Sequence, residues 1–141
     1  DKEKTLGETK MSYGYTKTTH STFDTAVDKI KETLKDQGFG VISEIDLQAK
    51  LKEKLGVEYG KYLILGACNP KSAYAVLQKE KEIGLLLPCN VIVYEDEGSV
   101  KISTVLPLKM LELTENKEIG DLAVEIEKKL KTAVDKACND K

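Results

Sequence analysis

The stretch LGACNPKSAYAVLQKEKEIGLLLPCNVIVYE, residues 65–95, decides the fold. An almost continuous apolar run over 61–68 leads into it and has the length of an inner β-strand. Asn69 followed by Pro70 then favours the start of a helix, because asparagine can cap free amides and proline fits the first helical turn. The returning run over 85–95 has the composition of a second strand. The stretch therefore predicts a strand, a helix and a further strand.

The helix of this stretch is expected to end near Lys81, and Gly84 is expected to close the segment. Residues that recur at helical spacing form one face, which we expect to point inward. The predicted inward face holds Ala73, Tyr74 and Leu77, with Val76 at its margin.

Two Cys-Asn steps make the same stretch a candidate site. Cys68 closes the first strand beside a helix N-terminus, where the helix dipole favours a thiolate, and Cys89 lies in the second strand. Pro88 cannot donate to a strand ladder, so that end of the strand is expected at an edge or a bulge. The candidate ligand-binding residues are Cys68, Asn69, Pro88 and Cys89. The alternative is plain core packing, because unpaired cysteines are among the most buried residues.

Elements N-terminal to this stretch follow from the same patterns. Aromatic and β-branched residues over 11–19 predict a strand. One apolar stripe predicts a helix over 22–37, capped by Ser21 and ended by Gly38 in a left-handed conformation. Alternation over 39–46 predicts a second strand with one wet face.

Three further elements complete the chain. Leucines at every fourth position predict a short helix that ends at Gly56 and lies on the sheet. Gly98 favours a hairpin turn between the strand over 85–95 and a strand that follows it. An apolar stripe about five turns long predicts a final helix from Lys117, whereas the apolar run LKMLEL before it is too short to classify.

These elements predict a single α+β domain over 11–141, preceded by a polar tail over 1–10. The expected architecture is a mainly antiparallel sheet with two long amphipathic helices on one face and short extra helices.

Four runs of sequence carry a resemblance to a known family: GFGVISEIDLQAKLKEKLG, GACNP, GLLLPCNV and VKISTVLP. With them, about residues 13–135 resemble the family catalogued as domain of unknown function 302. The resemblance implies a compact β-α-β-β-β-β-α plan, similar to half of a TATA-binding protein. It implies no catalytic residue.

The basic residues limit the kinds of partner. All 22 are lysine, and the 24 acidic residues give a net charge of -2. Arginine is the usual bidentate reader of phosphate and guanine, and here lysines and carboxylates are interspersed. The composition therefore argues against nucleic-acid binding.

The cysteine pattern bears on compartment. Three widely spaced cysteines without a CxxC step or a histidine pair indicate neither a disulfide framework nor a zinc site. We therefore expect a reducing, cytoplasmic location. The alternative is an exported form from which a leader has been removed. No apolar run reaches the roughly 20 residues that span a bilayer, so no membrane span is expected.

Other candidate chemistry is sparse. His20 is the single histidine, and it is expected in an exposed loop unless the fold brings it to a cysteine. Glu44 and Asp46 could pair on one strand face, although a solvated face explains them as well. Five tyrosines suit either sheet packing or an interface: Tyr13, Tyr15, Tyr62, Tyr74 and Tyr94.

The sequence favours binding over catalysis. Our first hypothesis is a non-enzymatic, homo-oligomeric protein, expected as a homodimer, that binds a small ligand or partner on the sheet or near the two Cys-Asn steps. No metal or cofactor is predicted. The alternative is a thiol-dependent redox or sulfur-handling protein that uses Cys68 with Cys89 as its resolving partner.

Overall fold

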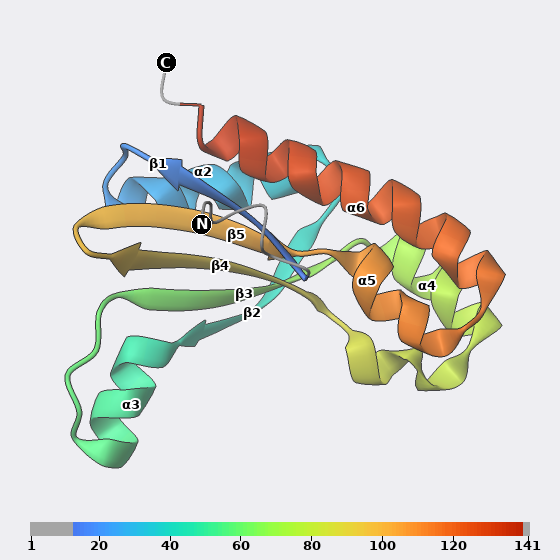
Figure 1. Cartoon of the computed structure of the whole chain (residues 1–141), viewed down its shortest axis with the longest axis horizontal. Helices are drawn as coiled ribbons and strands as arrows, with labels where there is room; N and C mark the ends of the chain where they lie inside the picture. The colour runs from blue at the N-terminus through green and yellow to red at the C-terminus, as the bar shows by residue number, and fades with distance from the viewer. Residues whose placement is uncertain (1–12, 140–141) are drawn as a thin grey trace, which may run out of the picture.

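An antiparallel five-stranded sheet forms the centre of the fold (Figure 1). The computed structural model describes residues 13–139, so the predicted tail over 1–10 lies outside the described residues. The strand order is β1-β5-β4-β3-β2, and all four pairings are antiparallel. The inner position predicted for the strand that ends at Cys68 is confirmed, because β3 lies between β4 and β2. The strands are β1 (Gly14–Thr19), β2 (Gly40–Asp46), β3 (Tyr62–Cys68), β4 (Cys89–Asp96) and β5 (Ser99–Val105).

Two long helices cover one face of the sheet, as predicted. They are α2 (Phe23–Asp36) and α6 (Lys117–Ala137). The element order confirms the α+β class and the β-α-β-β-β-β-α plan, with short helices inserted between strands. The short elements are α3 (Leu47–Leu55), α4 (Pro70–Lys79), α5 (Pro107–Leu111) and the 3-10 helices η1 (Lys81–Leu86) and η2 (Glu112–Thr114).

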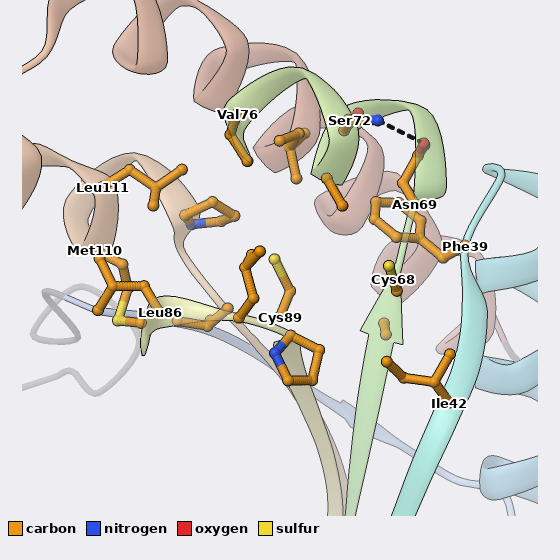
Figure 2. A pocket seen from close by; sticks show the side chains of 17 residues that line it. Phe39, Ile42, Cys68, Asn69, Ser72, Val76, Leu86, Cys89, Met110 and Leu111 are labelled. Atoms are coloured by element: carbon orange, nitrogen blue, oxygen red, sulfur yellow. Dashed lines mark hydrogen bonds between the residues drawn. The ribbon is translucent and has the colours of Figure 1, made fainter. Parts of the chain in front are cut away.

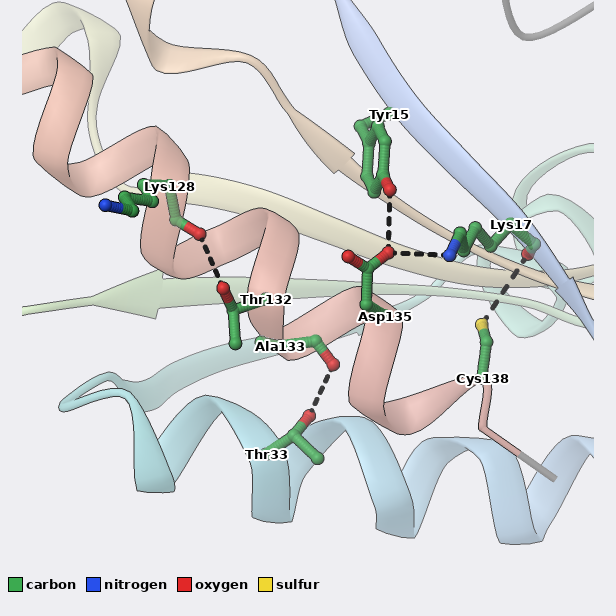
Figure 3. Close-up of polar contacts among 8 residues, drawn as sticks. All are labelled: Tyr15, Lys17, Thr33, Lys128, Thr132, Ala133, Asp135 and Cys138. Carbon is green, nitrogen blue, oxygen red and sulfur yellow. Dashed lines mark hydrogen bonds and ion pairs between the residues drawn. The ribbon is translucent and has the colours of Figure 1, made fainter. Parts of the chain in front are cut away.

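The main core lies between the sheet and the two long helices. Alternate strand residues point into it, and the apolar stripes of α2 and α6 meet them. Thr33 of α2 also donates a 2.9 Å hydrogen bond to the carbonyl oxygen of Ala133 in α6 (Figure 3). The fully buried members include Ile30, Leu34, Leu65, Val91, Val93, Ile102, Leu130 and Val134.

A second, smaller core lies at one end of the sheet. It joins α4, η1, α5 and the first half of α6. The predicted helix from Lys117 thus serves both cores along its 21 residues. The buried members are Val76, Ile83, Leu111, Ile119 and Ala123.

The helix ends follow from the sequence with one correction. The N-cap of α2 is Thr22, whose side chain accepts from the amide of Thr25, and not Ser21 as predicted. Both hydroxyl residues can cap, and the position is decided by which residue has the extended backbone before the first turn. Gly38 follows α2 with a φ of +89°, as predicted.

The short helix α3 ends at Gly56 as predicted, where φ is +70°. The expectation that it lies on the sheet is wrong. None of its residues is buried, and it projects beyond the ends of β2 and β3 (Figure 1). Its leucine stripe is too narrow and too short to be covered by the strands that flank it.

The prediction of a strand over the whole of 85–95 is also wrong. Leu85 and Leu86 belong to η1, and β4 begins only at Cys89. Pro88 therefore precedes an inner strand and lies at neither an edge nor a bulge. The register shift in the sheet is found in β2 instead, between Val41 and Ser43.

The predicted hairpin between β4 and β5 is confirmed. Its two-residue turn is Glu97 and Gly98, with φ values of 52° and 86°. Two successive left-handed residues give the turn type whose twist matches that of paired strands.

Polar contacts fix the edge strand β1 to the end of α6 (Figure 3). Asp135 accepts hydrogen bonds from the hydroxyl of Tyr15 at 2.7 Å and from the ammonium group of Lys17 at 2.8 Å. The thiol of Cys138 points to the carbonyl oxygen of Lys17 at 3.8 Å. Within residues 13–139 no helix has both the length and the apolar character needed to cross a bilayer.

Candidate functional site

An apolar cavity of about 200 Å³ lies where the two cores meet (Figure 2). Phe39, Ala67 and Ile126 reach it from the main core, whereas Val76 and Leu111 reach it from the smaller core. The two cores are packed around different parts of α6, and the space between them is left open at the end of the sheet.

All four residues singled out in the sequence line this cavity: Cys68, Asn69, Pro88 and Cys89. Antiparallel pairing of β3 with β4 is the reason, because it brings the end of one strand beside the start of the other. Cys89 pairs directly with Ala67, the residue before Cys68. Figure 2 shows the sulfur of Cys89 directed toward α4.

Helix α4 forms the roof of the cavity. As predicted, Asn69 caps it by accepting a 3.2 Å hydrogen bond from the amide of Ser72, and Pro70 occupies its first turn. The predicted inward face was partly wrong. Tyr74 is 67% exposed and Leu77 is 38% exposed, whereas Val76 is buried.

The orientation of α4 explains why space remains. It turns its large side chains outward and presents small ones to the strands. Ser72, Ala73 and Val76 line the cavity, and none of them is long enough to fill it.

One wall of the cavity depends on Gly66 in β3. A Cβ at this position would lie 2.8 Å from Cγ of Pro88 and would also collide with Oγ of Ser43. Only glycine lets Pro88 pack across β3 at this distance. The Leu87–Pro88 peptide bond is cis.

The electrostatic character of the site differs from that of a reactive thiol centre. Burial raises the pKa of Cys89 to about 11, and the electrostatic interaction with Cys68 acts in the same direction. Both thiols are free and partly buried. Cys89 is therefore protonated at neutral pH, because its thiolate would lose its hydration.

The sequence did not reveal the part of the cavity formed by α5. Pro107, Met110 and Leu111 line it, and α5 is held by a 3.1 Å hydrogen bond from the amide of Leu108 to Glu127 of α6. The apolar run LKMLEL was a signal of burial but gave no position in space. The sequence also did not show that Phe39, Ile42 and Ile126 line the cavity, because they come from distant segments.

The remaining sequence candidates are placed elsewhere. His20 is exposed at the end of β1, which pairs with the hairpin end of β5, whereas Cys68 and Cys89 lie at the opposite end of the sheet. The predicted loop position of His20 is therefore confirmed.

The two strand carboxylates have structural roles. Asp46 caps α3 through the amide of Ala49 at 2.9 Å, and Glu44 forms an ion pair with Lys31. Across the described part of the chain, no three His, Cys, Asp or Glu side chains gather as a group that could hold a metal ion.

Comparisons with known proteins identify the family and agree with the fold. A crystal structure of an uncharacterised conserved protein DUF302 from Bacillus stearothermophilus matches with a TM-score of 0.85 and 30% sequence identity. The match covers 92% of this chain and 100% of that one. A search of curated proteins found no match. The model of the family described as domain of unknown function DUF302 matches residues 15–137, and the chain therefore belongs to this family.

Proposed function

We propose that this protein is a binding protein that takes a small apolar molecule into the cavity between α4, α5 and the strands β3 and β4. The observation that carries the proposal is the cavity itself, which lies at the residues that the sequence singled out and is almost entirely apolar in its lining. A concave, mostly apolar pocket with a few polar atoms is the usual form of a small-molecule site.

The volume limits the size of the ligand. An engineered apolar cavity of about 150 Å³ stays dry and takes up benzene. A cavity of about 200 Å³ would therefore suit one substituted aromatic ring or a short branched alkyl group. Asn69 and Ser72 supply polar atoms at one end only, so a ligand with a single polar group would be tolerated there.

Binding is favoured over catalysis by what surrounds the cavity. General acid–base chemistry needs titratable groups within hydrogen-bond reach of the reacting atoms. Among the described residues, those that line the cavity with a titratable side chain are Cys68 and Cys89, and none of the others is a carboxylate, histidine or lysine.

Thiol chemistry is the second candidate function, because both cysteines line one cavity. A redox thiol is normally a low-pKa, accessible group. The raised pKa of Cys89 argues against that role for this residue. The proposal retains self-association as a homodimer, which is independent of the cavity.

Toluene is a suitable probe for the cavity. At about ten times its dissociation constant it is expected to raise the melting temperature of the wild-type protein by about 4–6 °C, because it binds only the folded state. The melting temperature can be followed by circular dichroism in sealed cells.

A matched pair of variants in α4 provides the control. Ala73 lines the cavity and Ala75 does not. Ala73→Leu should fill the space and abolish the shift caused by toluene, whereas Ala75→Leu should retain it. A wild-type protein that shows no shift at saturating toluene would contradict the proposal.

A further inference from the structure

The sheet has a second face, which we call the outer face. Its residues alternate with those that point into the main core. The strand register places them in rows across the sheet. The rows are Ser43, Gly66 and Asn90; then Ile45, Ile64, Ile92, Ser103 and Thr16; then Tyr62, Tyr94, Lys101 and Thr18; and last Asp96 and Ser99. Gly14 and Val105 form a further pair on this face, beyond Thr16 and Ser103.

The long helices leave the outer face uncovered. The helical members of the main core come from α2 and α6, which pack on the opposite side. In Figure 1 the strands lie in front of α2. Ile45 is 44% exposed, and Ile64 and Ile92 are only partly buried.

The composition of the outer face is unlike that of an ordinary solvated surface. Charged residues make up 33% of the chain, yet these rows hold two charged residues, Lys101 and Asp96. The rings of Tyr62 and Tyr94 stack with centroids 5.4 Å apart, and Tyr59 packs against Tyr62 at 6.3 Å. Depletion of charge and enrichment of tyrosine are typical of the central part of a protein interface.

The size of the outer face matches a second sheet. Strands of six to eight residues spaced about 4.8 Å apart give a face of about 24 Å by about 20 Å. A specific dimer buries about 800 Å² of accessible surface on each partner. The pleat and the side chains make the accessible area of the outer face larger than this flat area, and two sheets pack face to face about 10 Å apart.

The first ten residues of the chain are a poor match for this surface. They read DKEKTLGETK, in which charged residues alternate with polar ones. Burying those charges against Ile64 and Ile92 would leave them without partners. A second copy of the outer face brings apolar and hydroxyl groups instead, and a two-fold axis makes one patch complementary to itself.

We propose that two copies of this chain pack through their outer faces, with the row from Ile45 to Ile92 at the centre of the interface. This inference rests on the self-association included in the proposed function and names its surface. It does not depend on the cavity, which lies at the end of the sheet.

The test is the molar mass of the protein by size-exclusion chromatography with light scattering across the micromolar range. The wild type is expected to be a dimer. Ile45→Lys, on the edge strand β2, should weaken the dimer by about tenfold or more, because it places an unpaired charge in the interface. Ile92→Lys, at the centre of the row, should have a larger effect.

Val124→Lys is the matched control, because Val124 is 54% exposed but lies on α6. It should remain a dimer. Thermal melts establish which variants are folded, and Ile45→Lys keeps the test decisive if Ile92→Lys does not fold.

The outcomes separate this inference from the proposed function. A wild type that stays monomeric across the range would overturn both the interface and the self-association, while toluene binding would be untouched. A dimer that persists unchanged in folded Ile45→Lys would overturn the outer face alone.

Discussion

Single residues at the candidate site act mainly through the space that they leave or fill. Gly66 matters because it has no side chain, which lets Ser43 and Pro88 approach closer than a Cβ at this position would allow. Cys89 acts as a buried protonated thiol in the wall of an apolar cavity. Both residues shape the cavity without supplying a charge.

Gly66→Ala is expected to destabilise the protein by about 1–3 kcal/mol, because the new Cβ would force Pro88 and Ser43 apart. Urea unfolding measures this change. Gly40→Ala on β2 is the matched control, since a Cβ there meets nothing within 4 Å. Equal stability of the two variants would show that the close approach at Gly66 is not needed.

Alkylation of Cys89 by iodoacetamide should be slow at neutral pH and accelerate about tenfold for each pH unit as the pH rises toward about 11. The physical reason is that the thiolate is the nucleophile and burial disfavours it. The measurement uses a protein with Cys68→Ser and Cys138→Ser, with mass spectrometry of the remaining thiol. A rate that levels off near pH 8 would revive the redox alternative.

At the scale of elements, caps fix where α4 and α6 begin, and only one of these helix ends meets the cavity. Asn69 caps α4 and Asn116 caps α6, each through its side-chain oxygen. Asn69 also lines the cavity, whereas Asn116 does not. Variants at these two asparagines can therefore separate the contribution of a cap to stability from its contribution to ligand binding.

Asn69→Ala and Asn116→Ala should each lower the free energy of unfolding by about 1 kcal/mol, through loss of a cap. Only Asn69→Ala should also weaken toluene binding, because the first turn of α4, which lines the cavity, would fray. Denaturant titrations with and without toluene give both quantities. Equal toluene affinity in the two variants would mean that the cap of α4 does not shape the cavity.

At the scale of the whole molecule, Asp135 near the end of α6 holds the edge strand β1 through Tyr15 and Lys17. Burial by itself would raise the pKa of Asp135, but hydrogen bonds from Lys17 and Tyr15 outweigh burial and lower it. A lowered carboxyl pKa stabilises the folded state above the ordinary pKa of the group. That stability is lost as the pH falls through the lowered value.

Asp135→Asn is therefore expected to destabilise the protein at neutral pH by less than about 1 kcal/mol, because the group is partly exposed. The difference from wild type should shrink below about pH 4, where the wild-type carboxyl becomes protonated in the unfolded and then the folded state. Urea midpoints at several pH values test this, with Glu125→Gln on the same helix as control. A difference that stays constant down to pH 2 would be inconsistent with this role of the charge.

The sequence by itself determined the features that depend on neighbouring residues. The N-cap Asn69, the left-handed glycines Gly38, Gly56 and Gly98, and the apolar stripe of α6 could all be predicted, because each rests on a local backbone requirement. The α+β order of elements followed from them.

The tertiary structure alone decided where these elements leave space. The cavity exists because α5 and α6 meet α4 and the ends of β3 and β4, which are distant segments of the chain. Packing between distant segments also decides that α3 projects from the sheet and that the short helix η1 precedes Pro88. A periodic pattern states which face of an element is apolar, but the partner that covers it is set by packing between elements, and that information is spread over the whole chain.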